Sequence, residues 1–156
     1  MPHPTLEHWH QIVKTRDARE LANILAEHVV FESPVVHTPQ VGKAITLAYL
    51  QAALSVLNNE HLHYLNQWES AQSAVLEFQT ICEGITVNGV DIIHWNDAGR
   101  IDHFKVMVRP LKAINTLHAL MGQVLQQGRG SRSTIASCPT CLPSSPPPDS
   151  PRPTPR

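Results

Sequence analysis

One carboxyl group stands out among the residues that could do chemistry, because it lies in an apolar stretch. Asp91 alternates with Ile93 and Trp95, and this pattern predicts a β-strand over 90–95. Burying a bare carboxylate is costly, so such a group is expected to be protonated or to have a partner. Asp91 is therefore the candidate acid or base. The alternative is a structural role, in which it points outward or bonds a neighbour such as His63 or a backbone amide.

Aromatic side chains come next, because they can form the wall of an apolar pocket and two of them carry hydroxyl donors. Residues of this kind at helix or strand spacing also build ordinary cores, and both interpretations stay open. The candidate aromatic pocket residues are Trp9, Tyr49, Tyr64, Trp68, Phe78 and Phe104.

Metal and cofactor chemistry has little support in the pattern of ligand-type residues. His61 and His63 share one strand face, but no third ligand is identified for them. The Cys138-Pro-Thr-Cys141 segment has no second Cys or His pair nearby. The sequence contains no Gly-rich phosphate loop, G-x-S-x-G elbow or H-E-x-x-H helix. We therefore expect no metal and no cofactor.

Composition divides the chain at residue 126. Residues 1–126 hold eight Lys or Arg against twelve Asp or Glu, and this negative charge argues against a nucleic-acid partner. Residues 127–156 are rich in Pro, Ser and Arg and are predicted to be a disordered tail with two P-x-x-P matches. No membrane span or signal peptide is predicted, so we expect a cytoplasmic protein.

The elements that must position Asp91 follow from periodicity and turn signals. Helices are expected over 5–13, 17–25, 41–57 and 110–125, and strands over 28–32, 61–70, 74–83, 90–95 and 101–109. Asn88-Gly89 predicts a hairpin turn before the strand that carries Asp91. This order indicates an α+β domain over 1–126, with helices on one face of a curved antiparallel sheet.

Three segments give the chain a family resemblance. They are the stretch 17–28, the Phe31-Glu-Ser-Pro sequence, and the strand–turn–strand segment 90–101 with its Asn-Asp-Ala-Gly-Arg-Ile turn. Together they resemble the nuclear transport factor 2-like superfamily, in particular its SnoaL-like and ketosteroid isomerase-like proteins, over residues 5–125. The resemblance implies a cone-shaped sheet wrapped around three to four helices, with an apolar pocket at one end. It also implies a homodimer through the outer sheet face, where His103, Lys105, Met107 and Arg109 would lie.

The resemblance also implies site positions. Ketosteroid isomerases have at the position of Asp91 a protonated aspartic acid that donates to an oxyanion. Their general base would fall at Ser33 and their tyrosine donor at Trp9. The arginine of the epoxide hydrolases would fall at Gly89, and the second acid of the hydrolases and cyclases at Val106. These replacements argue against those particular mechanisms.

We therefore expect a small-molecule protein with an apolar pocket and an apolar ligand. If it is an enzyme, it is an isomerase, cyclase or epoxide hydrolase-type enzyme that uses Asp91 as acid or base. The alternative is a non-catalytic ligand-binding or dimerisation module in which Asp91 is structural.

Overall fold

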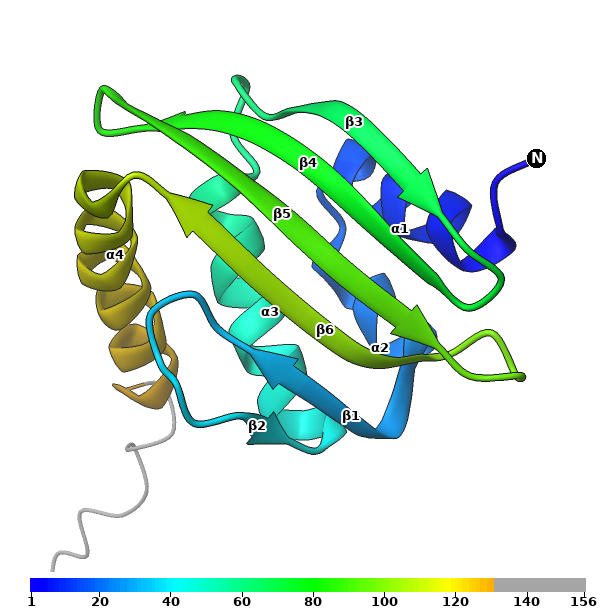
Figure 1. The fold of residues 1–156 in the computed structure, drawn as a ribbon. Helices are drawn as coiled ribbons and strands as arrows, with labels where there is room; N and C mark the ends of the chain where they lie inside the picture. The colour runs from blue at the N-terminus through cyan, green and yellow to red at the C-terminus, as the bar shows by residue number, and fades with distance from the viewer. Residues whose placement is uncertain (131–156) are drawn as a thin grey trace, which may run out of the picture.

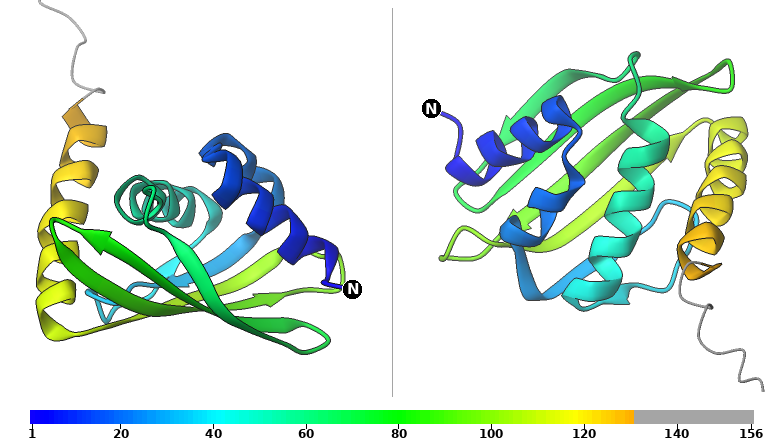
Figure 2. Two further views of the ribbon diagram at one scale, coloured as in Figure 1. Left: turned by 90° about the horizontal axis from the view of Figure 1, so that it is seen from above. Right: turned by 180° about the vertical axis from the view of Figure 1, so that it is seen from behind.

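A curved six-stranded sheet forms one layer of the protein, and helices cover its inner face (Figure 1, Figure 2). The computed structural model describes residues 1–130. Helices α1, α2 and α3 lie across the inner face, and α4 stands at one side of the sheet next to α3 (Figure 2). The helices are α1 (Pro4–Thr15), the short 3-10 helix η1 (Ala18–Glu20), α2 (Leu21–Ile24), α3 (Lys43–Leu57) and α4 (Leu111–Gly130). The predicted α+β architecture is confirmed.

The strands follow the order β2-β1-β6-β5-β4-β3 across the sheet. They are β1 (Leu25–Glu32), β2 (Gln40–Val41), β3 (His63–Glu69), β4 (Ser73–Cys82), β5 (Ile85–Trp95) and β6 (Ile101–Arg109). Every neighbouring pair is antiparallel except β1 and β6, which run parallel. A parallel pair requires a long connection, and here α3 and several strands separate the two partners in the chain. The sheet is therefore antiparallel, as predicted, at every pair except this one.

The hairpin turn between β4 and β5 lies earlier in the chain than the sequence predicts. Glu83 and Gly84 form it, with φ angles of 49° and 75° in the left-handed region that glycine adopts most readily. Asn88 and Gly89 lie inside β5, opposite Gln79 and Phe78 of β4. The Asn-Gly signal is therefore wrong as a turn prediction, and Gly89 serves a packing need described below.

The core lies between the inner sheet face and the helices. Alternation along β4, β5 and β6 turns every second side chain inward, and α1 adds a buried stripe at helical spacing. The largest fully buried side chains include Leu6, Ile12, Phe31, Leu50, Leu76, Ile93, Ile101 and Phe104. Packing in this core fixes the pairing of β4, β5 and β6. That pairing decides which side chains surround Asp91 on the inner face.

Helix α4 continues to Gly130, so the tail predicted from residue 127 begins within a helix. The Cys138–Cys141 pair, the P-x-x-P matches and the rest of the predicted disordered tail lie outside the described residues. Within residues 1–130, no helix has both the length and the apolar character needed to cross a membrane.

Candidate functional site

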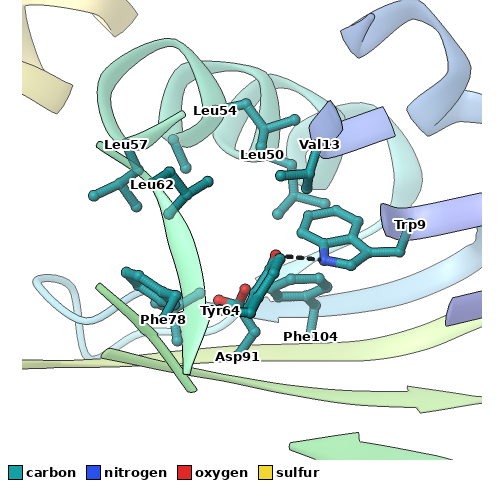
Figure 3. A pocket seen from close by; sticks show the side chains of 12 residues that line it. Trp9, Val13, Leu50, Leu54, Leu57, Leu62, Tyr64, Phe78, Asp91 and Phe104 are labelled. Carbon is teal, nitrogen blue, oxygen red and sulfur yellow. Dashed lines mark hydrogen bonds between the residues drawn. The ribbon is translucent and has the colours of Figure 1, made fainter. Parts of the chain in front are cut away.

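A small cavity lies between the inner sheet face, α1 and α3, and Asp91 faces it (Figure 3). Asp91 lies on β5 between Leu76 of β4 and Val106 of β6, so its two cross-strand neighbours are apolar. Phe78 and Phe104 complete the sheet side of the cavity. The strand pairing thus places one carboxyl group on an otherwise apolar floor.

Helices α1 and α3 and the start of β3 close the cavity from above. Trp9 and Leu50 are buried, whereas the other side chains are only partly covered and form its rim. The cavity volume is about 40 Å³. A water molecule needs roughly 10–15 Å³ measured in this way, so the space admits a few waters at most. The helix and loop residues that line it are Trp9, Val13, Leu50, Ala53, Leu54, Leu57 and Leu62.

The environment of Asp91 keeps its carboxyl group neutral. The side chain is buried, with 7 % of its surface exposed, and none of the described residues forms a hydrogen bond with its carboxyl oxygens. Burial disfavours the charged form and raises the pKa of Asp91 to about 8. Near neutral pH the group is therefore mainly protonated, with a smaller population of carboxylate.

Tyr64 places a second polar atom in the cavity. The indole Nε1–H of Trp9 donates to the Tyr64 hydroxyl oxygen at 3.0 Å, and Figure 3 shows this bond beside Asp91. Because that oxygen accepts from Trp9, its own proton remains available to donate toward the cavity. Burial and the nearby Asp91 charge raise the pKa of Tyr64 far above its usual value, so the hydroxyl stays protonated. The cavity thus combines an ionisable acid with a permanent O–H donor.

The match to known proteins is clearest for one domain family. The family described as the SnoaL-like domain matches residues 6–104. The chain belongs to the SnoaL-like domain family. None of the curated proteins matches this sequence significantly.

Solved structures extend the match over the whole domain. A steroid delta-isomerase from Pseudomonas aeruginosa is 35% identical, with a TM-score of 0.77, and the alignment covers 81% of this chain and 92% of that one. A protein with a cystatin-like fold from Silicibacter pomeroyi is 28% identical, with a TM-score of 0.75, and the alignment covers 83% and 92% of the two chains. Nuclear transport factor 2-like proteins share the fold at lower identity, such as one from Cytophaga hutchinsonii at 14% identity and a TM-score of 0.54, covering 70% of this chain and 90% of that one. The predicted superfamily membership is confirmed.

Six of the nine site residues predicted from the sequence meet at this cavity of the SnoaL-like domain. Three residues do not line it, and each has a physical reason. The six that meet are Trp9, Tyr64, Phe78, Asp91, Phe104 and Val106.

Trp68 is displaced by a bulge in β3. The pairing with β4 shifts between Tyr64 and Asn66, so Leu65 is an extra residue and the alternation changes phase after it. Trp68 consequently lies opposite Val75 on the outer sheet face, with 56 % of its surface exposed. Gln67 takes the inward position and bonds His10 on α1, with 2.7 Å between Oε1 and Nε2.

Tyr49 and Ser33 lie elsewhere for reasons of helix phase and strand length. Tyr49 precedes Leu50 by one residue on α3, which turns it about 100° away from the cavity, and its ring packs on Phe31 with 5.8 Å between centroids. Ser33 follows the last residue of β1, where its hydroxyl accepts a hydrogen bond from the Val35 amide at 3.2 Å. Neither residue lines the cavity that Asp91 faces.

The apolar helix and loop residues that line the cavity are the part of the site that the sequence did not assign. Val13, Leu50, Leu54 and Leu57 were recognisable as helical stripes, but such stripes predict a buried face without separating a filled core from a cavity wall. In the alternating pattern over 61–70, Leu62 falls on the face that points toward the helices. Spacing alone therefore locates these residues on the correct face and cannot assign them to the cavity.

Gly89 gives Phe78 its place beside Asp91. A Cβ atom at Gly89 would lie 2.5 Å from Cζ of Phe78 and 2.7 Å from the backbone oxygen of Met107. The position that resemblance assigns to an arginine therefore has no room for any side chain. The Phe78 ring occupies this space instead.

The histidines lie outside the cavity. His61 and His63 are exposed, and His61 approaches Glu60 at 3.5 Å. In the part of the chain that the structure describes, no group of three or more His, Cys, Asp or Glu side chains has an arrangement that would hold a metal ion.

Proposed function

We propose that this SnoaL-like domain binds a small apolar ketone in the cavity and acts on it as an isomerase-type enzyme, with Asp91 as acid and base. The observation that carries the proposal is the Asp91 carboxyl group, which faces an apolar cavity without a hydrogen-bond partner among the described residues. An unpartnered buried acid costs stability. A ligand that accepts the proton of Asp91, or a hydrogen bond from it, would explain why the fold keeps this costly group.

The chemistry follows from the two polar groups. With a β,γ-unsaturated ketone, Asp91 in its carboxylate form takes a proton from the carbon between the carbonyl group and the double bond, and the C–H electrons move toward the carbonyl oxygen to give a dienolate. The Tyr64 hydroxyl donates a hydrogen bond to the developing oxyanion, in the manner of an oxyanion hole. Asp91 then returns the proton at the γ carbon, which shifts the double bond without any other reactant. A pKa of about 8 allows both forms of Asp91 near neutral pH, as a general base requires.

The proposal agrees with the likeness to the protein named steroid delta-isomerase, which is 35% identical. The small cavity requires movement before such a ligand can enter, because a volume of about 40 Å³ does not hold a ring system. The half-buried rim residues Val13, Leu54, Leu57 and Leu62 are the side chains that would have to move.

One observation favours a second candidate function, ligand binding without turnover. Among the residues lining the cavity, Asp91 and Tyr64 are the ionisable ones, so no second carboxylate is available as a separate base. Protonated Asp91 and Tyr64 would then both donate hydrogen bonds to a ligand oxygen. Turnover measurements distinguish this function from the first.

The test uses two β,γ-unsaturated ketones, cyclohex-3-enone and a 3-keto steroid, whose conjugated products absorb in the ultraviolet. We expect turnover that rises with pH and levels off above about pH 8, where Asp91 is ionised. Asp91→Asn should lower kcat/KM by about 100-fold or more, because general base catalysis contributes that much. Asp102→Asn is the matched control, since Asp102 lies on β6 and does not line the cavity.

Calorimetric binding of the conjugated products completes the test. Turnover that survives Asp91→Asn would overturn the catalytic role. Product binding that weakens in Asp91→Leu, with no conversion of either ketone, would establish the binding function instead. No conversion and no Asp91-dependent binding would overturn both.

A further inference from the structure

A polar hollow lies directly outside the mouth of the cavity. Val13, Leu62 and Tyr64 line both spaces, so the hollow continues the cavity toward solvent. Its volume is about 370 Å³, far larger than the cavity itself. We call this space the vestibule. Its other lining residues are His10, Lys14, Arg16, Asn58, Asn59 and Glu60.

The charges of the vestibule are mainly positive. Lys14 belongs to the last turn of α1, and Arg16 follows the helix with a left-handed φ of 58°. Neither side chain forms an ion pair with another residue in the described part of the chain. The one carboxylate in the vestibule belongs to Glu60, whose Oε1 lies 3.5 Å from Nε2 of His61. Two cations are thus left facing a space next to an apolar cavity.

The walls of the vestibule are tied together by hydrogen bonds. The Asn58 side chain donates from Nδ2 to the carbonyl oxygen of Val13 at 2.8 Å, which joins the end of α3 to α1 at the cavity mouth. The ring of His10 meets the edge of Tyr64 with 5.0 Å between centroids, and His10 also bonds Gln67 of β3. The cations therefore extend from a helix end whose position relative to Tyr64 and the cavity is set by these contacts.

We infer that the ligand of this site is an anion: an apolar ketone that carries a carboxylate at the end opposite its carbonyl oxygen. The inference rests on the proposed function, in that the carbonyl end enters the cavity toward Asp91 and Tyr64. A body longer than the cavity must pass between Val13 and Leu62 into the vestibule. Its outer end then reaches Lys14 and Arg16, which attract a carboxylate. The two cations are specificity-determining residues that leave the chemistry at Asp91 unchanged.

Three probes of equal length distinguish the effect of ligand charge on binding affinity from the effect of ligand shape. They are 4-(4-acetylphenyl)butanoate, its neutral amide, and the corresponding primary amine, each titrated calorimetrically at low and high salt. We expect the butanoate to bind about three- to tenfold more tightly than the amide, because exposed ion pairs each contribute modestly. The amine should bind more weakly than the amide. The butanoate preference should shrink at high salt, since these charges are exposed to solvent.

The variants assign the preference to the vestibule. In the double variant Lys14→Gln/Arg16→Gln the butanoate and the amide should bind with equal affinity, whereas amide binding stays as in the parent protein. Lys112→Gln, which removes an exposed cation from α4, should keep the full preference. Thermal melts followed by circular dichroism verify that both variants are folded.

Each outcome separates this inference from the proposed function. Equal binding of butanoate and amide by the parent protein overturns the inference while leaving the cavity function standing. A preference that persists in the double variant does the same. If the parent protein converts cyclohex-3-enone or the 3-keto steroid but binds none of the three probes, the inference fails while the proposed function stands.

Discussion

Two carboxyl groups of the same sheet, Asp91 and Glu32, have pKa values shifted in opposite directions. Asp91 points inward from β5 between apolar neighbours, and burial raises its pKa to about 8. Glu32 lies at the end of β1 on the outer face. His103 approaches it with 2.6 Å between Nε2 and Oε1, and Lys105 with 3.4 Å between Nζ and Oε2. The hydrogen bond from His103, helped by Lys105, lowers the pKa of Glu32.

The comparison shows that the face of a strand decides what a carboxyl group can do. On the outer face the hydrogen bond from His103 and the charge of Lys105 hold Glu32 as a stable anion. On the inner face no cation from the described residues approaches Asp91, so its proton is available near neutral pH. The inner face therefore suits a carboxyl group that exchanges its proton, whereas the outer face suits one that stays charged.

The largest expected effect concerns the stability cost of the inner carboxyl group. The pKa of Asp91 rises from 3.8 in an exposed chain to about 8 in the fold, so the folded state holds the proton more tightly. Its contribution to stability is complete below about pH 4 and is lost as the pH rises through 8. We expect the unfolding free energy of the parent protein to fall by about 4 kcal/mol more than that of Asp91→Asn between pH 5 and pH 8.

Urea unfolding of both proteins at the two pH values measures this difference. The amide group that replaces the carboxyl group in Asp91→Asn does not titrate, so the constant cost of burying it cancels when the two pH values are compared. Parallel pH profiles would mean that Asp91 is not desolvated, and the contrast between the two faces would then disappear.

The next effect concerns how closely the inner face is packed around Asp91. In Gly89→Ala the new methyl group would meet the Phe78 ring and the Met107 backbone at less than 3 Å. Overpacking of this kind costs about 1–3 kcal/mol. Gly122→Ala on α4 is the matched control, because a Cβ there has nothing within 4 Å. It should stabilise the protein by about 0.5–1 kcal/mol through lower chain entropy and better helix propensity.

Chemical denaturation of the two alanine variants gives the result directly. Equal stability changes of the same sign would show that the inner face yields as easily as the surface of α4.

The smallest expected effect concerns the cluster of Glu32, His103 and Lys105 on the outer sheet face. It tests whether this cluster influences the pKa of Asp91 on the inner face. His103→Leu removes the hydrogen-bond donor that is the main cause of the lowered Glu32 pKa, so that pKa should rise toward its usual value. The pKa of Asp91 should not change, since burial is its cause. Carboxyl-carbon NMR titration follows both groups in one sample. A comparable shift at Asp91 would show that the two faces are electrostatically coupled, contrary to the comparison.

Strand alternation predicts the inner face well wherever the strand is regular. Asp91, Phe78, Phe104 and Val106 lie on the face that a period of two assigns to them, because β4, β5 and β6 pair without a break over this region. The apolar neighbours of Asp91, and hence its raised pKa, follow from that alternation.

Prediction fails where the backbone departs from regularity. The bulge at Leu65 reverses the phase of β3, and no residue type in that stretch signals it, so Trp68 is assigned to the wrong face. Asn88-Gly89 fails differently, because glycine has two uses: a turn conformation and close approach of another group. At Gly89 the glycine allows close approach of the Phe78 ring, and only the folded structure shows this. The distance between α3 and the sheet, which decides whether a cavity exists, is likewise a property of packing.

The small volume of the cavity has a consequence for the rates of binding. At about 40 Å³ it excludes any ligand large enough to reach both Asp91 and the vestibule, so entry must wait until Leu54, Leu57 and Leu62 separate. The observed association rate should then stop increasing with ligand concentration and reach the frequency of that separation. Side-chain motion at the rim would therefore limit the rate of association.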